Sequence, residues 1–283
     1  MPTTEPAIAI TGLAKEYRSV RRRERVQALQ GLDLTVGRGE VVALLGPNGS
    51  GKSTTIKLLL GLIRPTAGQA VVLGKPAGHR ATLRRVGYLP EETRLFPLLT
   101  AEETLRFFGS VAGLSRRERA EAARVLLADL DLAAVARRRT VGFSKGMTRR
   151  LGLGAALMGD PDLLILDEPT SGLDPLASAE VKRRIERLKA AGRTVLLSSH
   201  LLADVEDLCD RVAILGRGEL MHSGPADELL ELRDEFEVRF KGGGEDFAKR
   251  VRAFVEEGGA TDVTVRHPRE DLHGLFLRIF QGS

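Results

Sequence analysis

A glycine-rich segment constrains the fold more than any other feature. Residues 46–53 read Gly46-Pro47-Asn48-Gly49-Ser50-Gly51-Lys52-Ser53 and match the pattern G-x-x-x-x-G-K-[ST] in full. The segment follows the short apolar run 41–45 and precedes residues at helical spacing. Glycines let the backbone turn consecutive N–H groups onto phosphate oxygens, and the N-terminus of the following helix adds positive potential. The segment therefore predicts a phosphate-binding loop between a buried strand and a helix.

The positions of this loop have distinct expected roles. We expect Lys52 to reach the β- and γ-phosphates, Ser53 to ligate Mg²⁺ and Thr54 to contact the α-phosphate. The remaining loop positions should line the phosphates: Gly46, Pro47, Asn48, Gly49, Ser50 and Gly51. The apolar residues of 56–63 predict a helix after the loop, which Pro65 should end.

A second apolar strand, 163–166, ends in two carboxylates, Asp167 and Glu168. Acids at the carboxyl end of a buried parallel strand lie at the usual ligand crevice of an α/β sheet. Asp167 could hold Mg²⁺, and Glu168 could deprotonate an attacking water as a general base. Together with the phosphate loop, the pair predicts a site for nucleotide hydrolysis.

Strand and helix patterns alternate from residue 163 to 215 and indicate an α/β core with a largely parallel sheet. Capping-box sequences at Thr100 and Ser115 make the region of about 92–157 mainly helical. After Gly224-Pro225, a helix pattern and strand-like runs indicate a small α+β tail. We therefore expect a nucleotide-binding domain at 1–224, with a helical insertion, and an accessory module at 225–283.

Composition excludes several classes of protein. No stretch approaches the roughly 18 apolar residues that span a bilayer, so we expect no membrane span in this chain. The N-terminus lacks a secretory signal pattern, and the single cysteine, Cys209, fits a reducing cytosol. The net charge of +5, from 43 basic and 38 acidic residues, is mild and favours a solvated surface over a nucleic-acid-binding face.

Several further motifs follow in order along the chain: the segment 143–147 reads Phe-Ser-Lys-Gly-Met, and 171–174 reads Ser-Gly-Leu-Asp. The first resembles the signature LSGGQ, and the second the dimer-contact loop, of the nucleotide-binding subunits of ATP-binding-cassette (ABC) transporters. Tyr17 occupies the position of an aromatic that stacks on adenine. Glu91 occupies the glutamine-loop position, and His200 follows a strand as the family's switch histidine does.

The resemblance implies a P-loop NTPase (RecA-like) core with an antiparallel β subdomain and an inserted helical subdomain. It implies that ATP and Mg²⁺ bind between two subunits. One chain would supply Lys52, Asp167, Glu168 and His200, and the other would supply Ser144 and Gly146. Asp174 would lie in the dimer contact, and Glu91 would join the metal ligands. The expected partners are a second ATP-binding subunit, with a homodimer sufficient, and an integral-membrane permease at the inner face of the cell membrane.

Three residues depart from the family pattern: Glu91, Lys145 and Met147. The signature form is typical of the ABC-2 export branch, so the expected function is ATP-driven export through a separate permease. The alternative is a soluble ABC-type ATPase that switches a nucleic-acid or ribosome-associated process. Such relatives usually carry a long coiled-coil insertion or two cassettes, neither of which is visible here.

Overall fold

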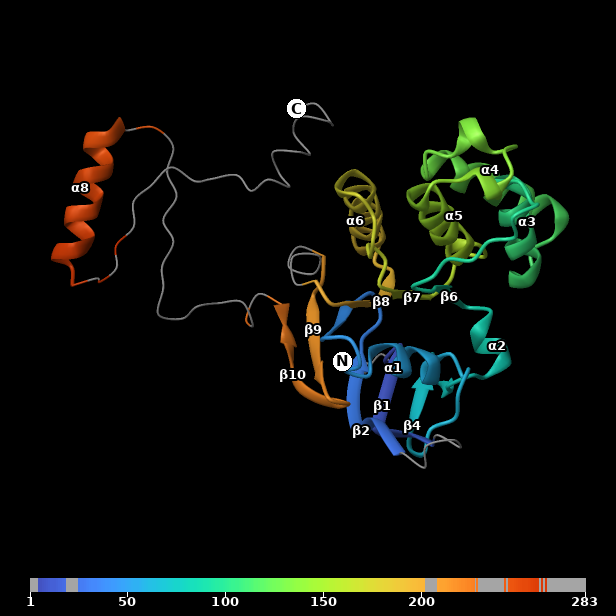
Figure 1. Ribbon diagram of the computed structural model, residues 1–283, viewed down its shortest axis with the longest axis horizontal. Coiled ribbons are helices and arrows are strands. Elements are labelled where there is room, and N and C mark those ends of the chain that lie inside the picture. The colour runs from blue at the N-terminus through green and yellow to red at the C-terminus, as the bar shows by residue number, and fades with distance from the viewer. Residues whose placement is uncertain are drawn as a thin grey trace. The chain divides into compact units, whose positions relative to one another are not determined.

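The computed structural model describes residues 5–18, 25–201, 208–226, 228, 242, 244–259, 261 and 263. It divides into two units, residues 1–230 and 231–283. The first is built on a six-stranded sheet of order β10-β9-β3-β8-β7-β6 (Figure 1). Its strands are β3 (Val41–Leu45), β6 (Val86–Leu89), β7 (Leu163–Asp167), β8 (Thr194–Ser199), β9 (Arg211–Gly216) and β10 (Glu219–Pro225).

Neighbouring strands of this sheet pair in parallel, except that β10 pairs antiparallel with β9. The carboxyl ends of β3, β6, β7 and β8 therefore lie at one edge. The phosphate loop follows β3, Glu91 follows β6, Glu168 follows β7 and His200 follows β8. The expected α/β class with a parallel sheet is confirmed, and the topology gathers four separate segments at one edge.

A second, antiparallel sheet covers one face of the first. Its order is β2-β1-β4-β5, formed by β1 (Ile8–Arg18), β2 (Arg25–Val36), β4 (Ala67–Val72) and β5 (Lys75–Pro76). Helix α1 (Lys52–Leu59) packs in the apolar core that the two sheets share, and the short α2 (Arg80–Leu83) leads into β6.

Helix α1 ends earlier than the expected stop at Pro65. The N–H of Leu62 donates to Lys57 O and that of Gly61 to Leu58 O, which is the Schellman arrangement. Gly61 takes the positive φ of 68° that this arrangement needs. The chain therefore turns away before it reaches the proline.

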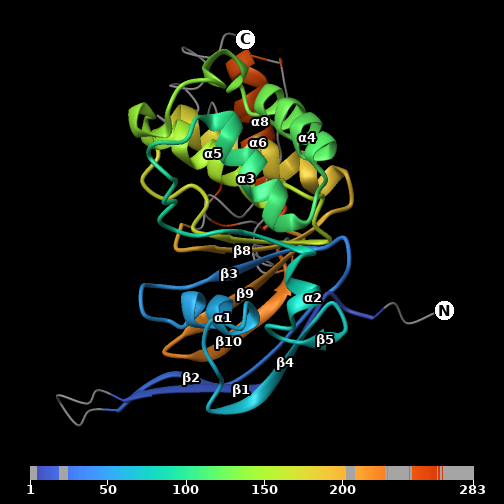
Figure 2. The same ribbon diagram turned by 90° about the vertical axis from the view of Figure 1, so that its right-hand side faces the viewer.

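Helices cover the other face of the parallel sheet, as Figure 2 shows. They are α3 (Ala101–Ala112), α4 (Arg116–Asp129), α5 (Lys145–Leu157) and α6 (Pro175–Ala190), with short 3-10 turns at Ala133–Val135 and Thr140–Gly142. Both capping boxes are confirmed: Thr100 and Ser115 accept from the backbone N–H groups of Glu103 and Glu118, whose side chains bond back to the cap residues.

The central strand β3 is buried on both faces. Val41, Ala43 and Leu45 face the core beneath the helices, whereas Val42 and Leu44 face the core shared with α1 and the antiparallel sheet. This two-sided burial explains why 41–45 is a continuous apolar run rather than an alternating one. It also gives the following loop a rigid base.

The second unit contains helix α8 (Gly244–Glu257), none of whose residues is buried. The strand-like runs that we expected in this tail fall on residues outside those described, apart from isolated positions.

Candidate functional site

The phosphate-binding loop has a backbone that only glycine accommodates at two positions. Gly46 has φ of 152°, and a Cβ built there would lie 2.3 Å from Leu215 O. Gly51, the N-cap of α1, has φ of 112°, and a Cβ there would lie 2.7 Å from a Leu29 methyl carbon. These close approaches explain the glycines of the motif. They let the loop turn tightly between β3 and the start of α1.

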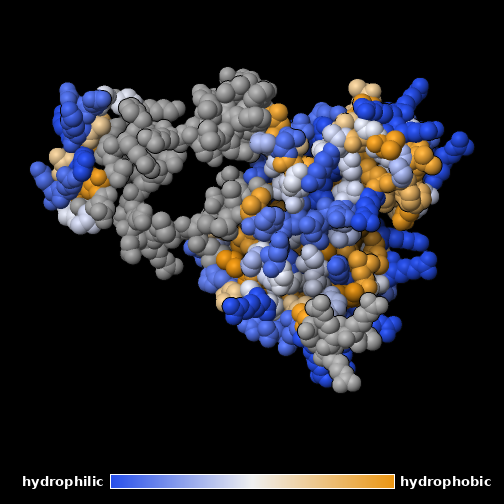
Figure 3. Space-filling model, in the orientation of Figure 1, coloured by the Kyte–Doolittle hydropathy of each residue, from blue (hydrophilic) through white to orange (hydrophobic). Residues whose placement is uncertain are grey.

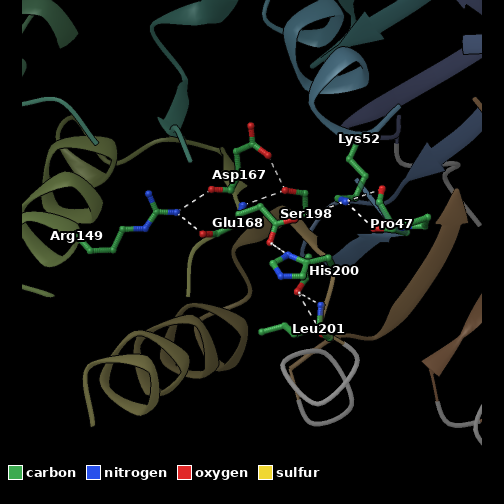
Figure 4. A network of polar contacts seen from close by, with 10 residues as sticks. Pro47, Lys52, Arg149, Asp167, Glu168, Ser198, His200 and Leu201 are labelled. Carbon is green, nitrogen blue, oxygen red and sulfur yellow. Dashed lines mark hydrogen bonds and ion pairs between the residues drawn. The ribbon is translucent and has the colours of Figure 1, made fainter. Parts of the chain in front are cut away.

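Lys52 is the first residue of α1, and its side chain is only 6% exposed. Its Nζ donates to Gly46 O at 2.6 Å and lies 3.5 Å from Glu168 Oε1. The other carboxylate oxygen, Glu168 Oε2, lies 2.8 Å from His200 Nδ1. Glu168 thus lies between Lys52 and His200, as Figure 4 shows. The structure brings together three side chains that are far apart in the sequence.

Glu168 takes an uncommon backbone conformation directly after β7. Its φ is 48°, in the left-handed region that residues with a Cβ rarely adopt. The turn carries its side chain towards Lys52, while Asp167 remains the last residue of the strand. A strained residue that is 6% exposed and faces a phosphate loop is typical of a functional position.

Ser198 connects the two acids, a role that the sequence did not reveal. Its hydroxyl donates to Asp167 Oδ1 at 2.6 Å and accepts from the Glu168 N–H at 2.9 Å. Ser198 pairs with Asp167 in the β7–β8 register and is fully buried. The sequence does not indicate this role of Ser198, because it depends on the pairing of β8 with β7, which is set by the tertiary structure.

Arg149 is a second residue that the sequence analysis missed. It lies on α5, is 4% exposed, and donates to carbonyl oxygens at the end of β7 and after β6. Burial lowers the pKa of its guanidinium to about 10, although nearby carboxylates, Asp167 first among them, oppose the shift. The side chain is therefore still a cation at neutral pH. Its only sequence signal is a charge on a helix whose neighbouring Leu151 and Leu153 are apolar.

Magnesium would find oxygen donors at this edge. Ser53 lies in the first turn of α1, and Asp167 uses one carboxylate oxygen for its hydrogen bond to Ser198 among the residues described. Glu91 is exposed in the loop after β6. No cluster of three or more His, Cys, Asp or Glu side chains suited to a metal occurs in the described part of the chain. A hydroxyl and one or two carboxylates still fit Mg²⁺, which takes its other ligands from water and nucleotide phosphates.

Other predicted site residues lie away from this cluster. Tyr17 is near the end of β1, 39% exposed, with Lys15 Nζ 5.3 Å from its ring centroid. Ser144 caps α5, its Oγ accepting from the Met147 N–H at 3.2 Å, as expected. Within the described residues, no hydrogen bond or ion pair joins Tyr17 or Ser144 to Lys52 or Glu168.

The starts of α5 and α6 lie side by side. A Cβ on Gly146 would lie 3.1 Å from Ala177 Cβ, and one on Gly172 would lie 2.0 Å from Lys145 Nζ. Asp174 caps α6, its Oδ1 accepting from the Ala177 N–H at 3.0 Å. The signature-like segment and the segment 171–174 therefore form one surface with two helix N-termini.

A comparison with protein-family models decides the identity. The model described as ABC transporter matches residues 29–171, from β2 through the phosphate loop to the turn after Glu168.

The chain belongs to the ABC transporter family.

Relatives agree with this assignment. This chain is 42% identical over 269 residues to an uncharacterized ABC transporter ATP-binding protein of Synechocystis, covering 93% of this chain and 75% of that protein. It is 39% identical over 253 residues to a fluoroquinolones export ATP-binding protein of Mycobacterium tuberculosis, covering 87% and 83%. A solved dimeric ATP-binding cassette in a post-hydrolysis state with ADP and phosphate is 25% identical, with a TM-score of 0.70 over 77% of this chain and 98% of that one.

The cassettes of this family are ATPases, and this ABC chain is accordingly an ATP-binding, ATP-hydrolysing subunit. The expected fold, a P-loop NTPase core, is confirmed by the structural likeness. The alternative of a nucleic-acid or ribosome-associated switch is not favoured by these relatives. No helix in the described part of the ABC chain is both long and apolar enough to cross a membrane.

Proposed function

We propose that this chain hydrolyses Mg-ATP as one of two cytoplasmic subunits that power export through a separate membrane permease. The observation that carries the proposal is the position of Glu168, which lies between Lys52 and His200 beside the phosphate loop. The proximity of a carboxylate, an ammonium and an imidazole supports roles for all three side chains at the γ-phosphate of ATP.

The residues divide the chemistry between them. The backbone of 46–51 and Lys52 bind the phosphates, and Tyr17 stacks on the adenine. Glu168 accepts a proton from a water molecule whose oxygen attacks the γ-phosphorus; the bond to the β-phosphate oxygen breaks, leaving ADP and inorganic phosphate. His200 orients the Glu168 carboxylate and the γ-phosphate. Ser53, Asp167 and Glu91 would hold Mg²⁺, which supplies positive charge for the developing negative charge on the phosphate oxygens.

A second subunit completes each site in this proposal. The starts of α5 and α6 carry Ser144, Gly146 and Asp174 on one surface, and two helix N-termini there favour a phosphate. The solved cassette of similar fold is dimeric. We therefore expect Ser144→Arg to reduce hydrolysis while the isolated chain still binds ATP. Loss of ATP binding by the isolated chain would argue against a site shared between two subunits.

The permease would contact an aromatic patch on the helical layer. We define this patch as Phe96, Leu98, Phe107, Val111 and Val141, which are between 42% and 73% exposed. The rings of Phe96 and Phe107 meet edge to face at 5.1 Å, and the Val141 N–H donates to Pro97 O. Figure 3 shows hydrophobic residues gathering on the side of the layer that carries α3. Neighbouring exposed apolar side chains are typical of an interaction site, which supports this patch as the docking surface.

Two experiments test the proposal. Glu168→Gln should abolish steady-state ATP turnover, leaving at most a slow residual single-turnover rate, but retain ATP binding and trap a dimer, detected by size-exclusion chromatography with ATP. Glu92→Gln, at an exposed carboxylate paired with Arg94, is the matched control and should hydrolyse normally. Normal hydrolysis by Glu168→Gln would refute the general-base assignment.

The second experiment concerns the partner. Leu98→Asp should retain ATPase activity but lose co-purification with the permease. The control is Leu62→Asp, at a residue that is 63% exposed after α1. Equal loss of the permease in both variants would exclude the aromatic patch as its docking site.

A further inference from the structure

One buried side chain connects three parts of the site. The guanidinium of Arg149 donates from Nη2 to Asp167 O at 2.7 Å and to Glu168 O at 2.6 Å, and from Nε to Pro169 O at 2.8 Å. Its Nη1 donates to Pro90 O, to Glu91 O at 2.9 Å and to Thr93 Oγ1 at 3.0 Å. Arg149 therefore links α5, the end of β7 and the loop after β6.

The oxygens that accept hydrogen bonds from Arg149 are neutral, so these contacts differ from an ordinary ion pair. Five of its six hydrogen-bond acceptors are main-chain carbonyls, and no salt bridge to Arg149 occurs among the described residues. A planar guanidinium with five N–H donors can serve several carbonyls at once, whereas a lysine ammonium has three donors at one point. The arrangement is suited to holding a backbone shape rather than to neutralising a charge.

The backbone that Arg149 holds is the strained one. Glu168 has φ of 48°, and Arg149 bonds the carbonyl oxygens of this residue and of both its neighbours. From this turn the carboxylate of Glu168 reaches Lys52 and His200. A residue keeps an uncommon backbone conformation when several contacts with its surroundings hold it there. Figure 4 shows the guanidinium on the side of the strand end opposite Lys52.

Arg149 also connects the turn 167–169 to the helix that begins in the signature-like segment 143–147. Helix α5 begins at Lys145, directly after its cap Ser144, and Arg149 lies in the second turn of that helix. Any shift of α5 relative to β7 must change the Arg149 hydrogen bonds. The Glu91 loop is bonded to the same guanidinium and would shift with it.

We propose that Arg149 is a positioning residue for ATP hydrolysis: it holds the turn 167–169 so that Glu168 stays between Lys52 and His200, and it couples this turn to α5 and to the Glu91 loop. The inference rests on the proposed role of Glu168. Arg149 touches neither nucleotide nor water in this account and acts only through the backbone it holds.

The test uses Arg149→Lys and Arg149→Gln, with Arg150→Lys as the matched control. Arg150 is the next residue of α5, but its Nη1 lies 3.1 Å from Glu180 on α6 and donates to Leu130 O. ATP affinity is measured by equilibrium dialysis and hydrolysis by phosphate release. Because a displacement of about 1 Å in a catalytic group costs roughly 100-fold in rate, we expect kcat to fall by at least about tenfold in both Arg149 variants. ATP affinity should change by less than about threefold, since Lys52 and the loop stay in place.

A double variant separates positioning from a merely structural role. If Arg149 acts through Glu168, then adding Arg149→Lys to Glu168→Gln should lower the residual single-turnover rate by less than about twofold. A general structural defect would lower the rate in both backgrounds alike. Arg150→Lys should hydrolyse ATP within about twofold of the unaltered chain, because it leaves the strand end untouched.

Several outcomes overturn the inference. They are unchanged kcat in Arg149→Lys, a parallel loss of ATP affinity, full additivity with Glu168→Gln, or failure of both Arg149 variants to fold while Arg150→Lys folds. If Arg149→Gln alone fails to fold, Arg149→Lys decides. If Glu168→Gln itself hydrolyses ATP normally, the proposed function fails first. If it is inactive and Arg149→Lys is fully active, only the positioning role fails.

Discussion

Replacing Ser198 by alanine should weaken both the fold and the metal site. The hydroxyl is fully buried and makes two hydrogen bonds, to Asp167 Oδ1 and from the Glu168 N–H. Alanine fits the same space and removes both bonds. Asp167 and Glu168 are 4% and 6% exposed, so water cannot readily replace the hydroxyl.

The magnitude follows from the two partners. A hydrogen bond to an ionised carboxylate contributes about 1.5–3 kcal/mol, and the bond from a neutral N–H contributes roughly 1 kcal/mol. We therefore expect Ser198→Ala to lower the free energy of unfolding by about 3 kcal/mol, a large part of the roughly 5–15 kcal/mol typical of a domain. With a urea m-value of about 3 kcal/mol/M, the unfolding midpoint should fall by about 1 M.

The functional readout is the Mg²⁺ concentration that gives half-maximal ATP hydrolysis. Ser198 orients Asp167, the proposed metal ligand, and loss of such an outer partner typically costs about 10–100-fold in metal affinity. We expect the half-maximal Mg²⁺ concentration to rise by at least about tenfold.

Thr194→Val is the matched control on the same strand. Thr194 Oγ1 accepts a neutral bond from the Gly39 N–H at 2.9 Å, at the opposite end of β8. This variant should lose about 1 kcal/mol and keep its Mg²⁺ dependence. A loss below about 1 kcal/mol in Ser198→Ala, or an unchanged Mg²⁺ dependence, would refute the account of the hydroxyl as the support of the two acids.

Three further outcomes are expected. Burial raises the pKa of the Cys209 thiol to about 12, so at pH 8 only about one thiol in 10⁴ is ionised. Iodoacetamide should alkylate the folded chain slowly, faster as pH rises, and rapidly only in urea; rapid alkylation of the folded chain at pH 8 would contradict this. Thr100→Ala should cost about 1 kcal/mol in urea unfolding, because the cap to the Glu103 N–H is lost, and Thr100→Ser should restore most of it. Gly87→Ala should cost about 3 kcal/mol or prevent folding, since its Cβ would lie 2.1 Å from Ala156 O; a thermal midpoint equal to that of the unaltered chain would show that the strand moves freely.

Local sequence was sufficient for the elements whose signals are local. The two capping boxes, the cap of α5 by Ser144 and the buried strands β3 and β7 all follow from a few adjacent residues, and the structure confirms each. The prediction that Pro65 ends α1 was wrong, because the apolar spacing through Ile63 extends past the turn at Gly61 that terminates the helix. Periodicity reports which residues are buried, and loop residues after a helix can be buried without being helical.

The candidate site likewise contains some residues that local sequence predicts and others that it does not. Glycines, Lys52, Asp167, Glu168 and His200 could be selected from the sequence because their types and flanking patterns suit phosphate chemistry. Ser198 and Arg149 could not be selected, because serine in a strand and arginine on a helix are common. Their roles depend on the pairing of β8 with β7 and on the packing of α5 against the strand end.

The sequence by itself determined that a phosphate loop follows a buried strand and that two acids follow another, since both are patterns of neighbouring residues. Only the tertiary structure decided that Glu168 lies between Lys52 and His200, 116 and 32 residues away along the chain, and that a buried guanidinium holds its backbone. The physical reason is that parallel strands end at a common edge, and the order of strands in a sheet is set by packing between distant segments rather than by local preference.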